Sequence, residues 1–223
     1  FQMGEKEDFV SELLEANSSR RKRQKKLDIR VIVGNPPYSA GQKSENDDNQ
    51  KVSYPLLDSS INNSYAKQSN ATLSKGIYNS YIRAIRWATD RLKDAGVIGF
   101  ISGSGFVDKP TMDGMRKCLA EEFTNIYVLN MRKKKKKNMM SKGKAKEGQN
   151  IFEGNSMSGI AITFFVKNPQ SKNCGNIFYY DIGDDLQTSE KKRILSLLKS
   201  VSGISSNDDW QKINPNEHGD WIG

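Results

Sequence analysis

The chain has 223 residues, a formal net charge of +9 at pH 7 and a pI near 9.4. That charge suits a polyanionic partner such as nucleic acid, although the lysine run at residues 133–137 alone supplies five of the nine charges. The sequence contains neither a bilayer-length apolar run nor a signal peptide, which predicts a cytoplasmic protein with no membrane partner. Two cysteines, Cys118 and Cys174, and one histidine, His218, cannot assemble a zinc site or a histidine-dependent triad.

The N-terminal part of the chain predicts a linker followed by a strand. Residues 1–26 have a short helical pattern and end in a strongly basic stretch. Residues 27–33 are apolar and β-branched and precede Gly34, which predicts a buried strand that ends at a turn. Polar residues 39–53 predict a long loop, and residues 54–65 predict a short helix.

The clearest helix is predicted over residues 77–92. Its apolar face consists of five residues at helical spacing, namely Ile77, Tyr81, Ile85, Ala88 and Leu92. Arg83 and Arg86 flank this face and are expected to be surface charges. Gly96 lies where a helix stop is needed, and residues 97–102 predict the next strand.

The middle of the chain predicts a helix and two further strands. Residues 111–123 are amphipathic, and residues 126–129 and 160–166 are β-branched and bounded by turn residues. Between those two strands, residues 132–150 are basic and have no apolar period, which predicts a loop. Because no helix separates the two strands, we expect them to pair as an antiparallel hairpin.

The C-terminal part predicts one more strand and helix, at residues 177–180 and 189–198. From Trp210 onward apolar residues are sparse, which predicts the beginning of a further module. Trp87 and Trp221, like Trp210, are expected to be packing residues. The alternation of strands and helices predicts an α/β fold whose sheet is parallel at first.

One tetrapeptide has the residue types that methylation of an exocyclic amine requires. The site must accept hydrogen bonds from both amine protons, so that the nitrogen lone pair faces the methyl donor. Asn35 offers a side-chain carbonyl and Pro36 a backbone carbonyl, while Pro37 helps to fix the backbone. Tyr38 offers a ring face for stacking a base. Asn-Pro-Pro is also ordinary turn chemistry, so a purely structural turn remains an alternative.

Asn-Pro-Pro-Tyr after a hydrophobic strand resembles motif IV of amino-methyltransferases, in the form found in the γ group of adenine-N6 DNA methyltransferases. Residues 96–102 (GVIGFIS) resemble their motif VI, and Phe152 resembles the aromatic position of motif VIII. The resemblance implies a Rossmann-like methyltransferase fold that uses S-adenosylmethionine. It implies that Asn35 and Pro36 orient the adenine amine, and that Tyr38 and Phe152 hold a base flipped out of double-stranded DNA.

Several stretches also resemble the methyltransferase region of Type ISP (single-polypeptide Type I) restriction–modification enzymes. They are residues 23–38 (RQKKLDIRVIVGNPPY), 81–87 (YIRAIRW), 116–123 (RKCLAEEF) and 218–221 (HGDW). In that family a nuclease and a helicase precede this region, and a target-recognition domain follows it. The resemblance implies a helical linker or coupler at 1–26, the catalytic half at 27–168 and a connection to the recognition region at 169–223.

The sequence departs from this family in two places. Lysines at residues 133–137 replace a stretch that is usually similar to Gly-Asn-Gln-Arg, and residues 1–34 hold no Gly-rich donor-binding motif. The glycines at residues 102–106 are better interpreted as a tight turn, so no cofactor-binding residue is assigned. We therefore expect an incomplete, C-terminal half of the fold that is inactive alone. Since the chain begins with Phe1, we expect it to be a piece of a longer polypeptide.

The function predicted from these observations is adenine-N6 methylation of DNA within a restriction–modification enzyme. Two alternatives stay open. A protein-glutamine N5 methyltransferase uses the same tetrapeptide, and a non-catalytic DNA-binding fragment is compatible with the missing donor motif. Asp181, Asp184 and Asp185 cluster without further ligands, so we interpret them as loop solvation and expect no metal site.

Overall fold

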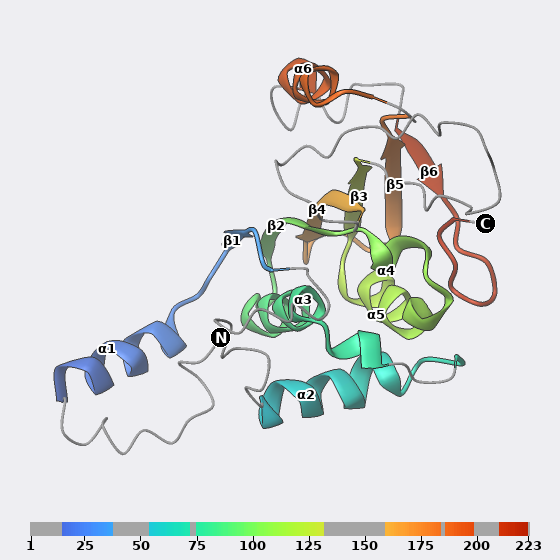
Figure 1. Ribbon diagram of the computed structural model, residues 1–223. Coiled ribbons are helices and arrows are strands. Elements are labelled where there is room, and N and C mark those ends of the chain that lie inside the picture. Colours follow the sequence, from blue (N-terminus) through green and yellow to red (C-terminus); the bar gives the residue numbers. More distant parts are fainter. Residues whose placement is uncertain are drawn as a thin grey trace, which may run out of the picture.

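Six strands form one mixed sheet in the order β1-β2-β4-β3-β5-β6 (Figure 1). The computed structural model describes residues 15–37, 54–71, 75–131, 159–183, 186–198 and 210–222. The strands are β1 (Val31–Gly34), β2 (Gly96–Gly103), β3 (Asn125–Asn130), β4 (Ile160–Lys167), β5 (Asn176–Asp181) and β6 (Gln211–Ile213). The predicted α/β class is confirmed.

The directions of the strands bring four carboxyl ends to one edge of the sheet. β1 is parallel to β2, and β4 is antiparallel to both β2 and β3. β5 is parallel to β3, and β6 is antiparallel to β5. The predicted parallel start and the predicted antiparallel pairing of residues 126–129 with 160–166 are both confirmed. Consequently β1, β2, β3 and β5 all end at the same edge.

Helices cover both faces of this sheet. They are α1 (Glu15–Lys26), α2 (Pro55–Ile61), the π-helix η3 (Asn62–Ala66), the 3-10 turn η4 (Lys75–Tyr78), α3 (Ser80–Arg91), α4 (Gly105–Asp108), the 3-10 turn η5 (Pro110–Met112), α5 (Asp113–Glu122) and α6 (Thr188–Leu198). α2, α3 and α5 lie on one face, α6 lies on the other, and α1 projects away from the sheet (Figure 1). Within the described residues, no helix is long and apolar enough to cross a membrane.

Side-chain alternation along the strands divides the apolar residues into two clusters. Ile98 and Phe100 of β2 belong to the larger cluster, together with buried residues of α3 and α5. Ile101 of β2 packs in the smaller cluster, with Ile194 and Leu198 of α6. This period of two is what a strand buried between two helical layers requires.

The helix predicted at residues 77–92 is shorter than expected. Asn79 has an extended backbone, and its side chain accepts a hydrogen bond from the Tyr81 amide at 3.3 Å, so the α-helix starts at Ser80. Ile77 instead lies in the 3-10 turn η4. The interpretation of Arg86 as a surface charge is wrong. Its side chain is 6% exposed and forms ion pairs with Asp90 at 2.6 Å and Glu122 at 2.9 Å.

The first strand and the glycine before the second strand also differ from the prediction. Residues 27–30 are not part of a strand, and pairing begins at Val31. Gly96 does not end a helix but opens β2 with φ = 148°. A Cβ atom there would lie 2.3 Å from the Arg30 carbonyl oxygen, so only glycine permits this close approach.

The C-terminal residues 211–222 join the sheet and the core of the described part of the chain. β6 pairs with β5, and Trp221 is 4% exposed, with its ring centroid 6.0 Å from that of Phe106. Trp210 packs edge-on against Tyr127 and Tyr180. The predicted packing roles of Trp210 and Trp221 are therefore confirmed.

A buried arginine fixes the last described segment to the helical layer. The Arg116 side chain on α5 is fully buried, and it donates hydrogen bonds to the carbonyl oxygens of Phe106, Lys109 and Gly219 at 3.1, 2.8 and 2.8 Å. It also forms an ion pair with Asp220 at 2.5 Å. We call these residues the Arg116 clamp, because one guanidinium joins α4, α5 and the C-terminal segment.

Candidate functional site

The Asn-Pro-Pro sequence lies at the carboxyl edge of the sheet. Gly34 is the last residue of β1, opposite Phe100 of β2, and Asn35 follows it directly. Asn35 and Pro37 are exposed, and Pro36 is buried. An exposed amide beside a buried proline gives a fixed backbone with one side chain available to a ligand. Tyr38 and Phe152, the predicted aromatic residues, both lie outside the described residues.

β2 is longer than β1 and continues past the point where Asn35 follows β1. The β1–β2 pairing stops at Phe100, and β2 continues to Gly103. Ser102 is fully buried, and the Ser104 amide donates a hydrogen bond to the Gly159 carbonyl oxygen at 2.9 Å. Ser104 Oγ is buried and has no hydrogen-bond partner among the described residues. From the sequence, this serine was considered only as part of the turn at residues 102–106.

The glycines at residues 102–106 form a turn that joins β2 to α4 and has a structural role. Gly103 ends β2 and Gly105 begins the one-turn helix α4. Neither residue is among the described glycines with positive φ. Phe106 is fully buried in the larger apolar cluster, and its carbonyl is bonded by the Arg116 clamp. This arrangement supports the structural interpretation of the loop.

Farther along the same edge, polar side chains form a hydrogen-bonded chain. Asn130 Nδ2 donates to the Tyr179 hydroxyl at 2.7 Å, and that hydroxyl donates to Asp181 at 3.1 Å. Asp181 is half-buried, is the last residue of β5 and also accepts a hydrogen bond from the Gly183 amide at 3.0 Å, so it orders the end of this strand and is not a loop residue as expected. Asp184 and Asp185 lie outside the described residues.

A buried lysine holds α6 against this end of the sheet. Lys191 Nζ donates to the Met131 carbonyl oxygen at 2.9 Å, and burial lowers the pKa of this amine. Met131 is the residue directly after β3. The contact sets the position of α6 over the smaller apolar cluster.

The Asn-Pro-Pro turn has no ionisable side chain. Asn35, Pro36 and Pro37 carry no ionisable side chain, and within the described part of the chain no group of three or more potential metal ligands is present. The groups available are neutral oxygen acceptors on a rigid turn. Such acceptors can orient a hydrogen-bond donor such as an amine without taking its proton.

Comparison with protein families gives one match. The Eco57I family, described as Eco57I restriction-modification methylase, matches residues 3–153, a range that includes the whole Asn35 turn. None of the curated proteins compared with the chain matches it.

Solved structures give high similarity over nearly the whole chain. A structure of the ATP-dependent Type ISP restriction-modification enzyme LlaBIII bound to DNA is 46% identical, with a TM-score of 0.79 over 93% of this chain. A nuclease-deletion mutant of the Type ISP enzyme LlaGI, in complex with a DNA substrate mimic, is 43% identical over 93% of this chain, with a TM-score of 0.81.

A DrdV–DNA complex is 34% identical over 92% of this chain, with a TM-score of 0.75. The chain covers only 13% of the LlaBIII chain and 19% of the LlaGI and DrdV chains. The likeness to Type ISP enzymes expected from the sequence is therefore confirmed, over a small part of the length of those enzymes.

Proposed function

Because this chain belongs to the Eco57I restriction–modification methylase family, we propose that it carries the catalytic loop of a DNA methyltransferase that modifies adenine N6. One observation carries this proposal, namely the position of Asn35 and Pro36 at the carboxyl edge of the sheet, directly after β1 and beside the longer strand β2. Ligands of open α/β sheets bind at this edge.

In this proposal the two N–H groups of the adenine amine donate hydrogen bonds to the Asn35 side-chain carbonyl and to the Pro36 backbone carbonyl. Two acceptors in fixed positions pyramidalise the nitrogen and direct its lone pair, which is the arrangement that methyl transfer requires. The base reaches this point only after rotation out of the duplex, and Tyr38 and Phe152 are the proposed aromatic contacts on its two faces.

S-adenosylmethionine is the proposed methyl donor, and the described residues do not form a site that fits it. The glycines at residues 102–106 belong to a packed turn, and residues 1–34 hold no Gly-rich loop. We therefore propose that the donor is held largely by polypeptide outside these residues, in line with the small share of the LlaBIII and LlaGI chains that this chain covers. The isolated chain is then inactive, and titration calorimetry with S-adenosylmethionine should give no heat.

The partners proposed for the chain are double-stranded DNA and the nuclease, helicase and recognition parts of the same polypeptide. The DNA-bound states of the LlaBIII and LlaGI structures support the first of these, and the net charge of +9 is compatible with it. The assignment of residues 1–26 as linker, 27–168 as catalytic half and 169–223 as connection stays a proposal of the same kind.

The decisive experiment compares Asn35 variants in the complete polypeptide. Substitution Asn35→Ala removes one acceptor and should lower the rate of N6-methyladenine formation, measured by mass spectrometry of digested DNA, by about 10² to 10³-fold. Asn35→Asp keeps an acceptor oxygen and should lose less. Asn63→Ala, a change at another exposed asparagine, is the matched control and should leave the rate unchanged. Methylation of glutamine in a peptide, without methylation of DNA, would refute the adenine assignment.

A further inference from the structure

α1 is a helix whose charge is not explained by packing within this chain. Its twelve residues (EANSSRRKRQKK) include a single apolar residue, and six of the seven residues at positions 20–26 are Arg or Lys. A surface helix normally packs on its domain through an apolar stripe, which α1 lacks. α1 also projects away from the sheet (Figure 1). Its basic side chains therefore do not hold it against the core.

The spacing of these basic residues makes them repel one another. Arg21 and Lys25, and likewise Lys22 and Lys26, are four residues apart and are therefore neighbours on the helix surface. Lys25 and Lys26 lie in the last turn, where a cation interacts favourably with the helix dipole. Arg20, Arg21 and Lys22 lie one turn earlier and gain little from the dipole. A polyanion bound along α1 would replace this repulsion by attraction.

The end of α1 has a fixed position beside α3. Arg91 on α3 donates hydrogen bonds to the carbonyl oxygens of Gln24 and Lys25 at 2.8 and 3.2 Å. An α-helix leaves the carbonyls of its last turn without donors of its own, and the Arg91 guanidinium supplies them here. Arg91 also adds a cation next to the six of α1. A charged surface that is held in place loses less conformational freedom on binding than a free tail does.

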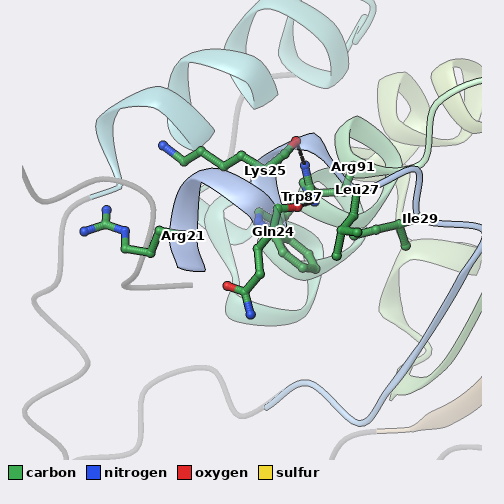
Figure 2. Close-up of a pocket in the computed structure, with 7 residues that line it drawn as sticks. All are labelled: Arg21, Gln24, Lys25, Leu27, Ile29, Trp87 and Arg91. Atoms are coloured by element: carbon green, nitrogen blue, oxygen red, sulfur yellow. Dashed lines mark hydrogen bonds between the residues drawn. The ribbon is translucent and has the colours of Figure 1, made fainter. Parts of the chain in front are cut away.

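A hollow lies between α1 and α3, with a volume of about 400 Å³ (Figure 2). Its lining combines three cations, one amide and three apolar side chains, namely Arg21, Lys25, Arg91, Gln24, Leu27, Ile29 and Trp87. Leu27 is 57% exposed and Trp87 is 39% exposed, so the apolar part of the lining is accessible. Such a lining suits a ligand that has an anionic group next to an apolar one.

We propose that α1 and this hollow form a contact surface for the sugar–phosphate backbone of duplex DNA, outside the nucleotide that is methylated. We call residues 20–26, Leu27, Trp87 and Arg91 the basic surface. Phosphate oxygens accept hydrogen bonds from its Arg and Lys side chains, and a deoxyribose lies against Leu27 and Trp87. The proposal rests on the proposed function in so far as DNA is the substrate there.

Charge density favours DNA over an acidic protein segment as the occupant. The seven residues at positions 20–26 extend over roughly 10 Å of helix axis and contain six cations. Duplex DNA has about six phosphates over the same length. A protein segment reaches this density only as a helix in which almost every residue is Asp or Glu. Duplex DNA has it at every position and in every sequence.

The basic surface is near the candidate catalytic turn but separate from it. α1 ends at Lys26, and Asn35 follows after β1, so the connecting residues span at most about 30 Å. This distance corresponds to about nine base pairs of duplex DNA. The basic surface therefore contacts DNA that flanks the target adenine. Because phosphate contacts carry no sequence information, its contribution to binding should be the same for all sequences.

The salt dependence of DNA binding tests the basic surface. Binding of the complete polypeptide to a fluorescent duplex of arbitrary sequence is followed by anisotropy between about 50 and 200 mM salt, without methyl donor. The variant combines Lys22→Gln, Lys25→Gln and Lys26→Gln, because glutamine removes the charge and keeps a high helix propensity. The slope of the logarithm of affinity against the logarithm of salt concentration should become shallower by about three, and affinity at the lowest salt should fall at least about tenfold.

A charge-matched control separates a local contact from the effect of net charge. Lys67, Lys172 and Lys192 are exposed and lie in three other parts of the chain. Their combined replacement by glutamine removes the same charge and should leave the slope nearly unchanged. Equal changes in slope for the two triple variants, or no change for the α1 variant, would overturn the proposal. A loss of stability of the complete polypeptide in the α1 variant, with an unchanged slope, would assign α1 to an acidic protein segment instead.

The hollow is tested by a change that removes no charge. Trp87→Ala should weaken DNA binding by about three- to fivefold at every salt concentration and leave the slope as it is, since the contact of Trp87 with a deoxyribose is apolar. An unchanged affinity would overturn the assignment of the hollow to DNA.

A variant of the catalytic turn distinguishes this proposal from the proposed function. Asn35→Ala should leave the slope unchanged, because the basic surface contacts DNA away from the methylated nucleotide. A complete polypeptide that binds DNA through α1 but forms no N6-methyladenine would refute the proposed function alone. Methylation of adenine by a polypeptide whose DNA binding is insensitive to the α1 variant would refute the basic surface alone.

Discussion

The two edges of the sheet differ in how they are covered by other parts of the chain. At the β5–β6 end, Trp210 covers the aromatic rings of Tyr127 and Tyr180, and the Arg116 clamp holds the C-terminal segment onto α4 and α5. At the β1 end, Val31 and Val33 are exposed and the free edge has no described neighbour. The β5–β6 end is therefore covered by ring packing and hydrogen bonds within this chain, whereas the β1 edge has exposed valines and no partner strand among the described residues.

Loss of the Arg116 clamp should have the largest effect on stability. Arg116→Met keeps most of the side-chain volume but leaves buried carbonyl groups of Phe106 and Lys109 without their donor and Asp220 without its partner. We expect the free energy of unfolding to fall by about 3–5 kcal/mol, measured by urea titration followed by circular dichroism.

A matched arginine checks whether burial causes this effect. Arg83 forms an ion pair with Asp58 at 2.7 Å, but its side chain is 21% exposed. Arg83→Met should therefore cost less than about 1 kcal/mol. A similar loss for the two variants would mean that burial of the Arg116 guanidinium is not the cause of its effect.

A pair of tryptophans compares the two ends directly. Trp221 is 4% exposed in the main core, and Trp87 on α3, beside Leu27 and Ile29 before β1, is 39% exposed. Trp221→Ala should lower the free energy of unfolding by about 3–5 kcal/mol, because it leaves a cavity next to Phe106. Trp87→Ala should cost about 1 kcal/mol in the isolated chain. Equal costs would contradict the division into a closed and an open end.

The N-terminus of α5 supplies a smaller effect that depends on pH. Burial alone would raise the pKa of Asp113, but hydrogen bonds from the Ser69 hydroxyl and from the Asn70 and Gly114 amides hold this pKa below its ordinary value. Since the folded state prefers the carboxylate, this stabilisation is complete above the ordinary value of 3.8 and is lost as pH falls through the lower, folded-state pKa.

Asp113→Asn should remove that contribution, about 1–2 kcal/mol at neutral pH. The measurement is the urea midpoint of the parent chain and of the variant at neutral pH and below the ordinary pKa. The difference between the two proteins should shrink at the acidic condition. A difference that stays constant with pH would show that the charge of Asp113 is not the stabilising element.

The smallest effect is expected at the open edge itself. Val33 is 79% exposed, so Val33→Lys in the isolated chain should change the free energy of unfolding by no more than about 0.5 kcal/mol. A large loss already in the isolated chain would mean that Val33 packs within this chain.

Local patterns predicted most of the elements because those patterns are periodic. Alternating β-branched residues marked β2, β3 and β4, and an apolar face marked α3, although the Asn79 cap moved its start to Ser80. The position of Asn35 in a turn directly after a strand was predicted from the apolar run that precedes it. The burial of Arg86 was not predicted, because its partners include Glu122, which lies 36 residues farther along the chain.

By itself, the sequence determined the α/β class, the parallel start of the sheet, the turn at Asn35 and the likeness to Type ISP enzymes, since each depends on neighbouring residues or on local composition. Only the tertiary structure decided that β4 lies between β2 and β3, that residues 211–222 join the sheet and core, and that β1 has no partner on its outer side among the described strands. It also explains Gly114, where a Cβ atom would lie 2.0 Å from the Tyr65 carbonyl oxygen. These features depend on contacts between residues far apart in the chain, which no local period encodes.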